Sequence, residues 1–330
     1  FASHLEKTYN KSPGNIEVKN ITVEKKLGST GIHIVRVALD SEVGSDDASI
    51  AVKIYDKSEQ ALEVVKRINM LEKRLFDYAK MGIASASVIF FSGSVIIMEG
   101  IQGDVFRESK IPKPQKYRYA GRGLAAFHGA QKNRVWFDKY KLLLARSLES
   151  APISGEKKLQ LQTSFNRVLP LAEQASQHSG CPSFGDFHPG NLIFDIRVGR
   201  NPMIQTHIID PEFLDISSEN DRLEDICNFF AVEAVDQYRM DKTLTKLAMN
   251  IKSFLAGYKE ILAHNQSSIT DYYSKDYIPI NFHLALMILM SILNIQHMED
   301  IFGGEAGIQR EIALRSNLIE KLLEDNSFPD

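Results

Sequence analysis

Two acidic residues and an asparagine are spaced so that they could act together in chemistry. Asp186 and Asn191 lie five positions apart, and Asp210 follows nineteen residues after Asn191. Pro189 and Gly190, between the first two, exclude a helix, so both side chains must converge on a loop. An aspartate can orient an attacking hydroxyl group, and amide and carboxylate oxygens suit Mg²⁺. Phosphoryl transfer from ATP requires this combination of groups.

A small-residue turn between two strand patterns could approach nucleotide phosphates. It consists of Gly28, Ser29, Thr30 and Gly31. Glycines and small hydroxyl residues allow backbone N–H groups to come close to phosphate oxygens. Turn chemistry alone favours a hairpin turn that binds no ligand, by about two to one. We therefore interpret this turn as a phosphate site only together with the other motifs.

Lys53 is a single lysine in an otherwise apolar strand pattern. An exposed lysine on an edge strand is the default interpretation. The apolar neighbours of Lys53 in the strand, however, indicate a buried position, and a buried ammonium needs a carboxylate partner. In the helix pattern that follows, Glu72 falls roughly 40° from the centre of the apolar stripe, whereas Glu63 falls on the far side. We expect a Lys53–Glu72 ion pair that holds the lysine against ATP phosphates. The alternative is that Glu72 lies at the rim and reaches water.

Four further residues have both a structural and a functional interpretation. Backbone groups of Glu99 and Ile101 could meet an adenine edge, although the same residues would form an ordinary interdomain linker. His128 ends a helix pattern, where a structural role is expected. Asp225 begins a helix pattern, where a carboxylate suits the helix dipole with no further role.

The predicted secondary structure changes from mainly strands to mainly helices near position 100. Strand patterns cover 16–55 in three runs, a helix pattern covers 56–81, and two short strands are expected at 88–91 and 94–98. Helical patterns then dominate at 116–132, 136–148, 156–177 and most of 223–330, interrupted by a strand hairpin at 192–194 and 206–209. These patterns predict an N-terminal nucleotide-binding lobe at 1–98, a hinge at 99–103, and a helical catalytic and substrate lobe at 104–330.

Composition excludes several classes of protein. The 330 residues are 44% hydrophobic and 25% charged, and the net charge of -3 gives no reason to expect nucleic acid or an anionic membrane as partner. Cys181 and Cys227 lack metal-site spacing, which favours reduced, buried thiols. The longest apolar run, 284–293, is too short to span a bilayer, and we expect no secretory signal. We expect a cytoplasmic protein without a membrane partner.

In combination, the motifs resemble those of the aminoglycoside phosphotransferase and choline kinase family, small-molecule relatives of the protein kinases. The resemblance extends over about residues 23–230. Segment 184–191, Phe-Gly-Asp-Phe-His-Pro-Gly-Asn, matches the family's catalytic loop, which usually begins His-Gly-Asp. The resemblance implies an α+β, two-lobed, protein-kinase-like fold. Its small antiparallel-sheet lobe would carry one main helix, and its larger lobe would be mainly helical with a helical insert near 133–180.

The resemblance also implies a role for each motif residue. Asp186 would be the catalytic aspartate, Asn191 and Asp210 the magnesium ligands, Lys53 the phosphate-binding lysine and Glu72 its partner. Asp225 would brace the catalytic loop through backbone N–H groups. ATP and Mg²⁺ would be the cofactors.

The chain departs from the family's pattern at the start of the catalytic loop. Phe184 stands where the family usually has a histidine, and because that histidine is mostly structural, an aromatic ring can fill its space. Segment 210–213, Asp-Pro-Glu-Phe, is similar to that of methylthioribose kinases. No Ala-Pro-Glu segment follows it, which argues against a protein substrate.

The expected function is Mg-ATP-dependent transfer of the γ-phosphoryl group to a hydroxyl of a small molecule, such as an aminoglycoside, an amino alcohol or a sugar. The motifs identify the donor side of this reaction and are silent about the acceptor. Two alternatives stay open: a pseudokinase-type nucleotide-binding module that acts through a partner, and an enzyme of the same fold that transfers a nucleotidyl group. Phe184 mildly supports the first alternative, whereas the intact set of Lys53, Asp186, Asn191 and Asp210 argues against it.

Overall fold

The computed structural model describes residues 17–27, 32–40, 46–129, 137–176, 180–197, 203–264, 278–295 and 298–324. The chain forms two compact units, one of residues 1–110 with 189–212 and one of residues 111–188 with 213–330. The sequence places the boundary at 99–103, whereas the contacts assign 104–110 and 189–212 to the first unit as well. The chain therefore leaves the first unit, returns to it for one hairpin, and leaves it again.

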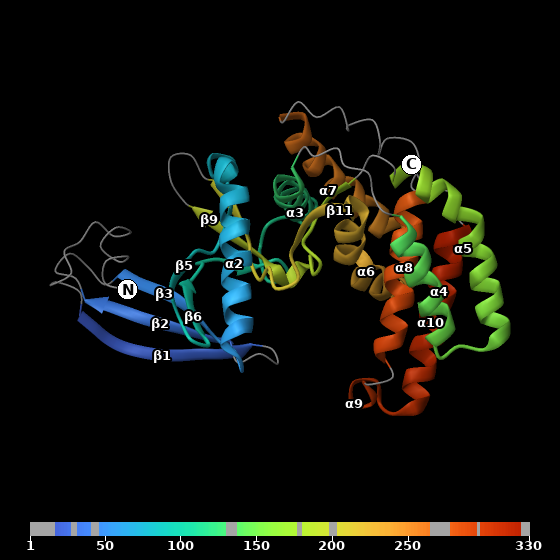
Figure 1. Ribbon diagram of the computed structural model, residues 1–330, viewed down its shortest axis with the longest axis horizontal. Helices are drawn as coiled ribbons and strands as arrows, with labels where there is room; N and C mark the ends of the chain where they lie inside the picture. The colour runs from blue at the N-terminus through green and yellow to red at the C-terminus, as the bar shows by residue number, and fades with distance from the viewer. Residues whose placement is uncertain are drawn as a thin grey trace. The chain divides into compact units, whose positions relative to one another are not determined.

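The first unit contains a five-stranded antiparallel sheet (Figure 1). The strand order is β1 (Glu17–Leu27), β2 (Ile32–Asp40), β3 (Asp46–Ile54), β6 (Val95–Glu99) and β5 (Val88–Ser92). These are the five strands that the alternating patterns predict. Because β3 pairs with β2 on one side and β6 on the other, Lys53 lies on a central strand, and the edge-strand interpretation of this lysine is wrong.

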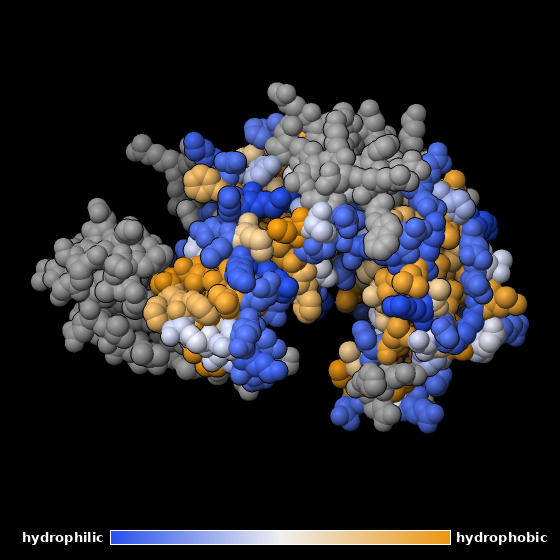
Figure 2. All heavy atoms as spheres, in the orientation of Figure 1, coloured by the Kyte–Doolittle hydropathy of each residue, from blue (hydrophilic) through white to orange (hydrophobic). Residues whose placement is uncertain are grey.

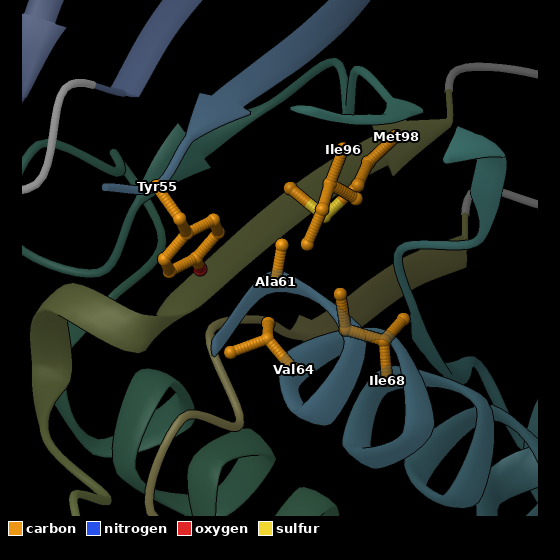
Figure 3. Close-up of a cluster of buried hydrophobic side chains, with 6 residues drawn as sticks. All are labelled: Tyr55, Ala61, Val64, Ile68, Ile96 and Met98. Atoms are coloured by element: carbon orange, nitrogen blue, oxygen red, sulfur yellow. The ribbon is translucent and has the colours of Figure 1, made fainter. Parts of the chain in front are cut away.

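One helix packs on this sheet through its apolar stripe. Helix α2 (Ser58–Leu75) continues as a 3-10 turn, η2 (Phe76–Met81), and ends at Gly82, whose positive φ of 75° suits glycine. The stripe contributes to a buried cluster of Tyr55, Ala61, Val64, Ile68, Ile96 and Met98 (Figure 3). Mainly hydrophilic side chains lie along the rest of α2 (Figure 2). The predicted helix is confirmed, and its burial fixes the strand that carries Lys53.

A second sheet of the first unit holds the returning hairpin. Its order is β4 (Ile83–Ser85), β10 (Met203–Ile208), β9 (Leu192–Arg197) and β7 (Asp104–Val105). The hairpin of β9 and β10 is the predicted one, and β10 also pairs in parallel with β4. The sequence patterns missed β4 and β7, which have three and two residues and therefore no periodicity to detect. This sheet brings 189–212 into the first unit.

The second unit is mainly helical. Its helices are α3 (Lys113–His128), α4 (Asp138–Ser150), α5 (Gly155–Ser176), α6 (Arg222–Asp241), α7 (Thr245–His264), α8 (Ile278–Ile295), α9 (Glu299–Phe302) and α10 (Glu305–Glu324). A two-stranded antiparallel sheet joins β8 (Gly180–Ser183) to β11 (Asp215–Asp221). Helix α8 contacts α5, α6 and α10 and is almost entirely buried, as its apolar sequence requires. Helices α4 and α5 occupy the predicted helical insert.

No helix in the described part of the chain is both long enough and apolar enough to span a membrane. Cys181 and Cys227 are buried free thiols, as predicted. Burial raises the pKa of both thiols well above the ordinary value, which keeps them protonated and unreactive.

Candidate active site

Lys53 is buried in the first unit and is neutralised by two carboxylates. The residue is 5% exposed. Its Nζ atom forms an ion pair with Asp210 Oδ1 and donates a hydrogen bond to Glu212 Oε1 at 3.0 Å. A buried ammonium requires such partners, because desolvation of an unpaired charge is strongly unfavourable. The expectation that Lys53 has a carboxylate partner is therefore correct.

The predicted partner, however, is wrong. Glu72 is exposed on α2, and its Oε1 atom accepts a hydrogen bond from the Ser87 hydroxyl at 2.9 Å. The periodicity placed Glu72 at the edge of the apolar stripe, where a long side chain can turn outward to water. The residue of α2 that contacts the Asp210 segment is Arg67, whose Nη1 atom donates to the main-chain oxygen of Glu212.

A backbone hydrogen bond joins the segments that carry Asn191 and Asp210. Asn191 ends a short 3-10 turn, η3 (Pro189–Asn191), and its carbonyl oxygen accepts a hydrogen bond from the N–H of Ile209 at 3.0 Å. Asp210 has a φ of 64°, in the left-handed region that aspartate tolerates better than most residues. A backbone held in this region often marks a functional position. Amide and carboxylate oxygens on adjoining backbone segments suit a hard cation such as Mg²⁺.

Glu212 remains ionised because its partners outweigh its burial. Burial raises the pKa of its carboxyl, but the charge of Lys53 and a hydrogen bond from the Tyr55 hydroxyl at 2.7 Å bring that pKa below its ordinary value. Burial, together with the Glu212 charge, raises the pKa of Tyr55, so the phenol stays protonated and donates. The sequence patterns did not single out Tyr55, although its position two residues after Lys53 places both side chains on one face of an extended segment.

Asp186 lies in the second unit, on the loop that follows β8. Its side chain is 44% exposed, and its Oδ2 atom lies 3.6 Å from Nε2 of His188. Interaction with His188, helped by a hydrogen bond from Asn228, lowers the pKa of Asp186 below its ordinary value despite partial burial. The carboxylate is therefore ionised at neutral pH and can accept a hydrogen bond from a hydroxyl group.

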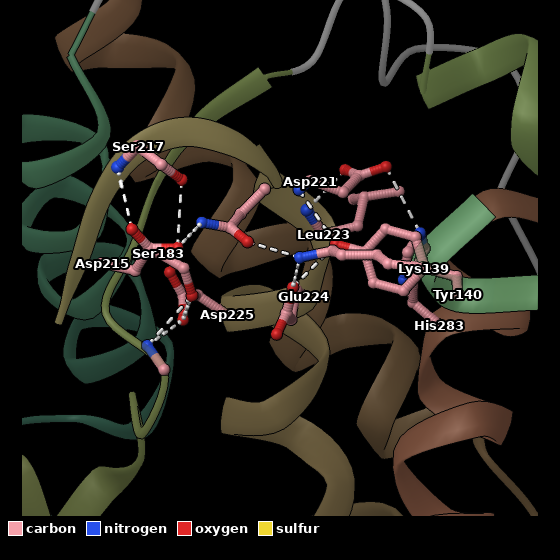
Figure 4. Close-up of polar contacts among 12 residues, drawn as sticks. Lys139, Tyr140, Ser183, Asp215, Ser217, Asp221, Leu223, Glu224, Asp225 and His283 are labelled. Atoms are coloured by element: carbon pink, nitrogen blue, oxygen red, sulfur yellow. Dashed lines mark hydrogen bonds and ion pairs between the residues drawn. The ribbon is translucent and has the colours of Figure 1, made fainter. Parts of the chain in front are cut away.

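Asp225 braces the start of this loop. Its carboxylate accepts hydrogen bonds from the N–H groups of Phe184 at 2.7 Å and Gly185 at 2.9 Å, and from the Ser183 hydroxyl at 3.2 Å (Figure 4 shows Ser183 and Asp225). It also pairs with His128 Nε2 at 2.9 Å. The predicted bracing role of Asp225 is confirmed.

His128 is a structural residue, as predicted. It is fully buried, and its second ring nitrogen, Nδ1, lies 2.6 Å from the Tyr258 hydroxyl. The ring therefore links helix α7 to the Asp225 carboxylate, which fixes the orientation of that carboxylate toward the loop.

The Phe184 side chain is packed among buried aromatic rings. Its ring is fully buried and meets those of Phe127 and Phe187 in edge-to-face contacts, with centroids 5.8 and 5.7 Å apart. Gly185, next in the chain, has a φ of 79°, and a Cβ there would lie 2.6 Å from the Phe213 carbonyl oxygen. The backbone bonds to Asp225 thus position the loop, while the side chain at position 184 contributes apolar packing.

A polar network that sequence patterns missed holds the neighbouring strand β11 (Figure 4). Lys139 Nζ donates to Asn220 Oδ1 and, at 3.1 Å, to Glu224 Oε2. Asn220 in turn donates to Asp215 at 2.9 Å. Because Asp215 pairs with Ser183 in β8, this network stabilises the strand that leads into the loop of Asp186. Its members are up to 85 positions apart in the chain, so no local signal could reveal it.

The other predicted nucleotide contacts are only partly visible. Gly28, Ser29, Thr30 and Gly31 lie outside the described residues. Glu99 ends β6, and its N–H donates to the Ser87 carbonyl oxygen at 2.9 Å, so this N–H group already has a partner within the first unit. The adenine contacts of Glu99 and Ile101 stay predictions.

Comparison with known proteins agrees with this architecture. A Plasmodium vivax ethanolamine kinase structure matches with a TM-score of 0.52 and 13% identity, over 94% of this chain and 82% of that chain. A choline kinase from Streptococcus pneumoniae matches with a TM-score of 0.50 and 15% identity, over 96% and 98%. The predicted α+β protein-kinase-like fold is confirmed.

A search of curated proteins found no match to the chain. The family model described as "Phosphotransferase enzyme family", however, matches residues 42–231, which is more than half of the chain. This matched range includes Lys53, Asp186, Asn191 and Asp210. The chain therefore belongs to the phosphotransferase enzyme family.

Proposed function

We propose that this phosphotransferase moves the γ-phosphoryl group of Mg-ATP to a hydroxyl of a small molecule. The observation that carries the proposal is the buried Lys53 paired with Asp210, beside which the backbone holds Asn191. This arrangement provides a fixed positive charge and two oxygen ligands within one compact unit. Family membership supports the reaction class.

On the donor side, each residue would have a distinct task. Lys53 would contact the phosphates, and Asn191 and Asp210 would hold Mg²⁺, which neutralises charge on the phosphoryl oxygens when bound. The turn of Gly28 to Gly31 would approach the phosphates with its backbone N–H groups, and backbone groups of Glu99 and Ile101 would meet the adenine edge.

On the acceptor side, Asp186 would accept a hydrogen bond from the attacking hydroxyl and aim its oxygen at the γ-phosphorus. As the new oxygen–phosphorus bond forms, the bond to the ADP oxygen breaks, and the hydroxyl proton passes to Asp186 and then to solvent. The lowered pKa of Asp186 supports orientation of the hydroxyl as its main contribution, since such a carboxylate is a weak base.

For the acceptor we propose an amino alcohol, an aminoglycoside or a related polyhydroxyl compound. The matched structures are an ethanolamine kinase and a choline kinase, both of which are named for amino-alcohol acceptors. The absence of an Ala-Pro-Glu segment after Asp210 in the sequence also supports a small acceptor over a protein.

The test combines nucleotide binding with turnover. Isothermal titration with ATP and Mg²⁺ comes first, followed by turnover on a panel of aminoglycosides, amino alcohols and sugars. Asp186→Ala should reduce turnover at least about 10³-fold while largely sparing ATP binding, because the aspartate acts on the acceptor. Asp300→Ala, which removes an exposed aspartate of the same unit, is the matched control.

The outcomes separate the alternatives. Undiminished turnover by Asp186→Ala would exclude the proposed mechanism. Mass spectrometry of the product distinguishes an added phosphoryl group from an added nucleotidyl group. If Mg-ATP produces neither a heat of binding nor a thermal shift, the chain is a pseudokinase-type module that acts through a partner.

A further inference from the structure

Lys53 shares one oxygen atom of Glu212 with a second donor. The Tyr55 hydroxyl donates to Oε1 of Glu212 at 2.7 Å, and Lys53 Nζ donates to the same atom at 3.0 Å. Side chains two residues apart in an extended segment lie on the same face, so both donors reach the carboxylate from one side. One carboxylate oxygen therefore fixes the relative positions of the lysine and the phenol.

The tyrosine is itself held in place by packing. Its ring lies in the buried cluster between the sheet and α2, beside Ala61 and Val64 (Figure 3). A ring enclosed in this way has few rotamers available, so the position of its hydroxyl is set by the core. Arg67, from the same helix, holds the main chain of Glu212. Both the side chain and the backbone of Glu212 are thus anchored to the β3–α2 region.

We propose that Tyr55 and Glu212 act as the positioning pair that holds Lys53 for the nucleotide, the task that the sequence pattern assigns to Glu72. The inference rests on the proposed function, because the position of Lys53 matters only if the chain binds ATP. If Asp210 also holds Mg²⁺, the metal ion competes with Lys53 for its carboxylate. Glu212 leaves Lys53 with a carboxylate when Asp210 turns to the metal, and Tyr55 keeps that carboxylate in place.

If Glu212 positions Lys53, changing Glu212 should weaken ATP binding and changing Glu72 should not. If Glu72 positions Lys53, the opposite should hold, which allows a direct test. The informative variants are Tyr55→Phe, Glu212→Gln and Glu72→Gln, with Glu59→Gln as the matched control because Glu59 is an exposed residue of the same helix. Tyr55→Phe removes one oxygen atom and leaves the ring in the cluster, so it tests the hydrogen bond without creating a cavity. The dissociation constant of ATP is measured by calorimetry, once with excess Mg²⁺ and once with EDTA.

Tyr55→Phe and Glu212→Gln should each weaken ATP binding about ten- to a hundredfold, the usual effect of losing a hydrogen bond to a charged group. The loss should be largest with Mg²⁺, when Asp210 turns to the metal. A smaller loss should persist in EDTA, where Asp210 stays with Lys53, because the pair still acts through Lys53 and not through the metal. Glu72→Gln and Glu59→Gln should bind ATP as the wild type does. In a Lys53→Met background, Tyr55→Phe should have no further effect on ATP affinity, a result that a merely structural role for Tyr55 would not produce.

Three results would overturn the inference while leaving the proposed function intact. One is a loss of ATP affinity in Glu72→Gln with none in Tyr55→Phe. Another is a loss that appears only with Mg²⁺, which would make Glu212 a metal ligand alone. The third is an undiminished effect of Tyr55→Phe in the Lys53→Met background. Failure of the wild type to bind Mg-ATP would instead refute the proposed function. If Glu212→Gln does not fold, the Tyr55→Phe measurements decide the question.

Discussion

The two units of this chain use carboxylates in contrasting environments. In the second unit, Asp225 is 1% exposed and receives hydrogen bonds from two backbone N–H groups, a serine and a histidine. In the first unit, the side chains of Asp210 and Glu212 are 30% and 22% exposed and share the ammonium of one lysine. Both groups are ionic, but only the second has solvent access and no bond from a backbone N–H group among these contacts.

The difference indicates what each site can do. Backbone donors cannot leave Asp225, so that carboxylate maintains a single loop conformation. Asp210 is paired with a side-chain ammonium, so another cation can take its carboxylate while Glu212 keeps Lys53 in place. A partly exposed carboxylate paired with a lysine side chain is suited to exchange that partner for Mg²⁺, whereas a buried carboxylate on backbone amides is suited to structural support.

The largest expected effect concerns the exchangeable carboxylate. Asp210→Asn should lower turnover about 10³-fold or more through loss of a metal ligand. Its stability should change little, because asparagine also tolerates a positive φ. Turnover at saturating Mg-ATP and urea unfolding measure the two quantities, with Asp77→Asn, an exposed aspartate of the same unit, as control. Retained turnover with a large loss of stability would reverse the comparison.

The corresponding change in the buried network should affect stability first. Asp225→Asn would place an amide NH₂ among N–H donors, and we expect the free energy of unfolding to fall by about 3 kcal/mol. Urea denaturation measures this loss. Asp236→Asn, on the exposed side of the same helix, breaks a surface ion pair with Arg239 and should cost well under about 1 kcal/mol. A cost for Asp225→Asn as small as that of the control would contradict the bracing role.

The smallest expected effect is the pH dependence of the Glu212 contribution. The pKa of Glu212 in the folded protein lies below its ordinary value of 4.5. Its contribution to stability is therefore complete above about pH 4.5 and is lost as the pH falls through the lower folded pKa. The difference in unfolding free energy between wild type and Glu212→Gln should be at most about 1 kcal/mol at pH 7 and should shrink below pH 4.5. A difference that grows on acidification would contradict the assigned direction.

Most of the fold was predictable because its elements carry strong local patterns. Apolar residues alternate with polar or small ones in the strand patterns of the first sheet, α2 has one apolar stripe, and Gly82 ends the helical segment. The unit boundary was harder to predict, because β4 and β7 are too short to show a period and the β9–β10 hairpin pairs with strands more than 80 residues away in sequence. Pairing at that distance depends on tertiary contacts, which a local pattern does not record.

The site divides in the same way. Residue types and spacing were enough to indicate which groups could handle a phosphoryl group, because the chemistry requires an aspartate, an oxygen pair for a cation and a lysine. The contacts of the folded chain were needed to show that Lys53 pairs with Asp210 and Glu212, that Glu72 turns to Ser87, and that Asp225 holds the backbone at Phe184. Periodicity assigns a residue to a face, but a long side chain near the edge of that face can point either way. The competing partners from other elements decide its direction, and those partners meet only when the chain has folded.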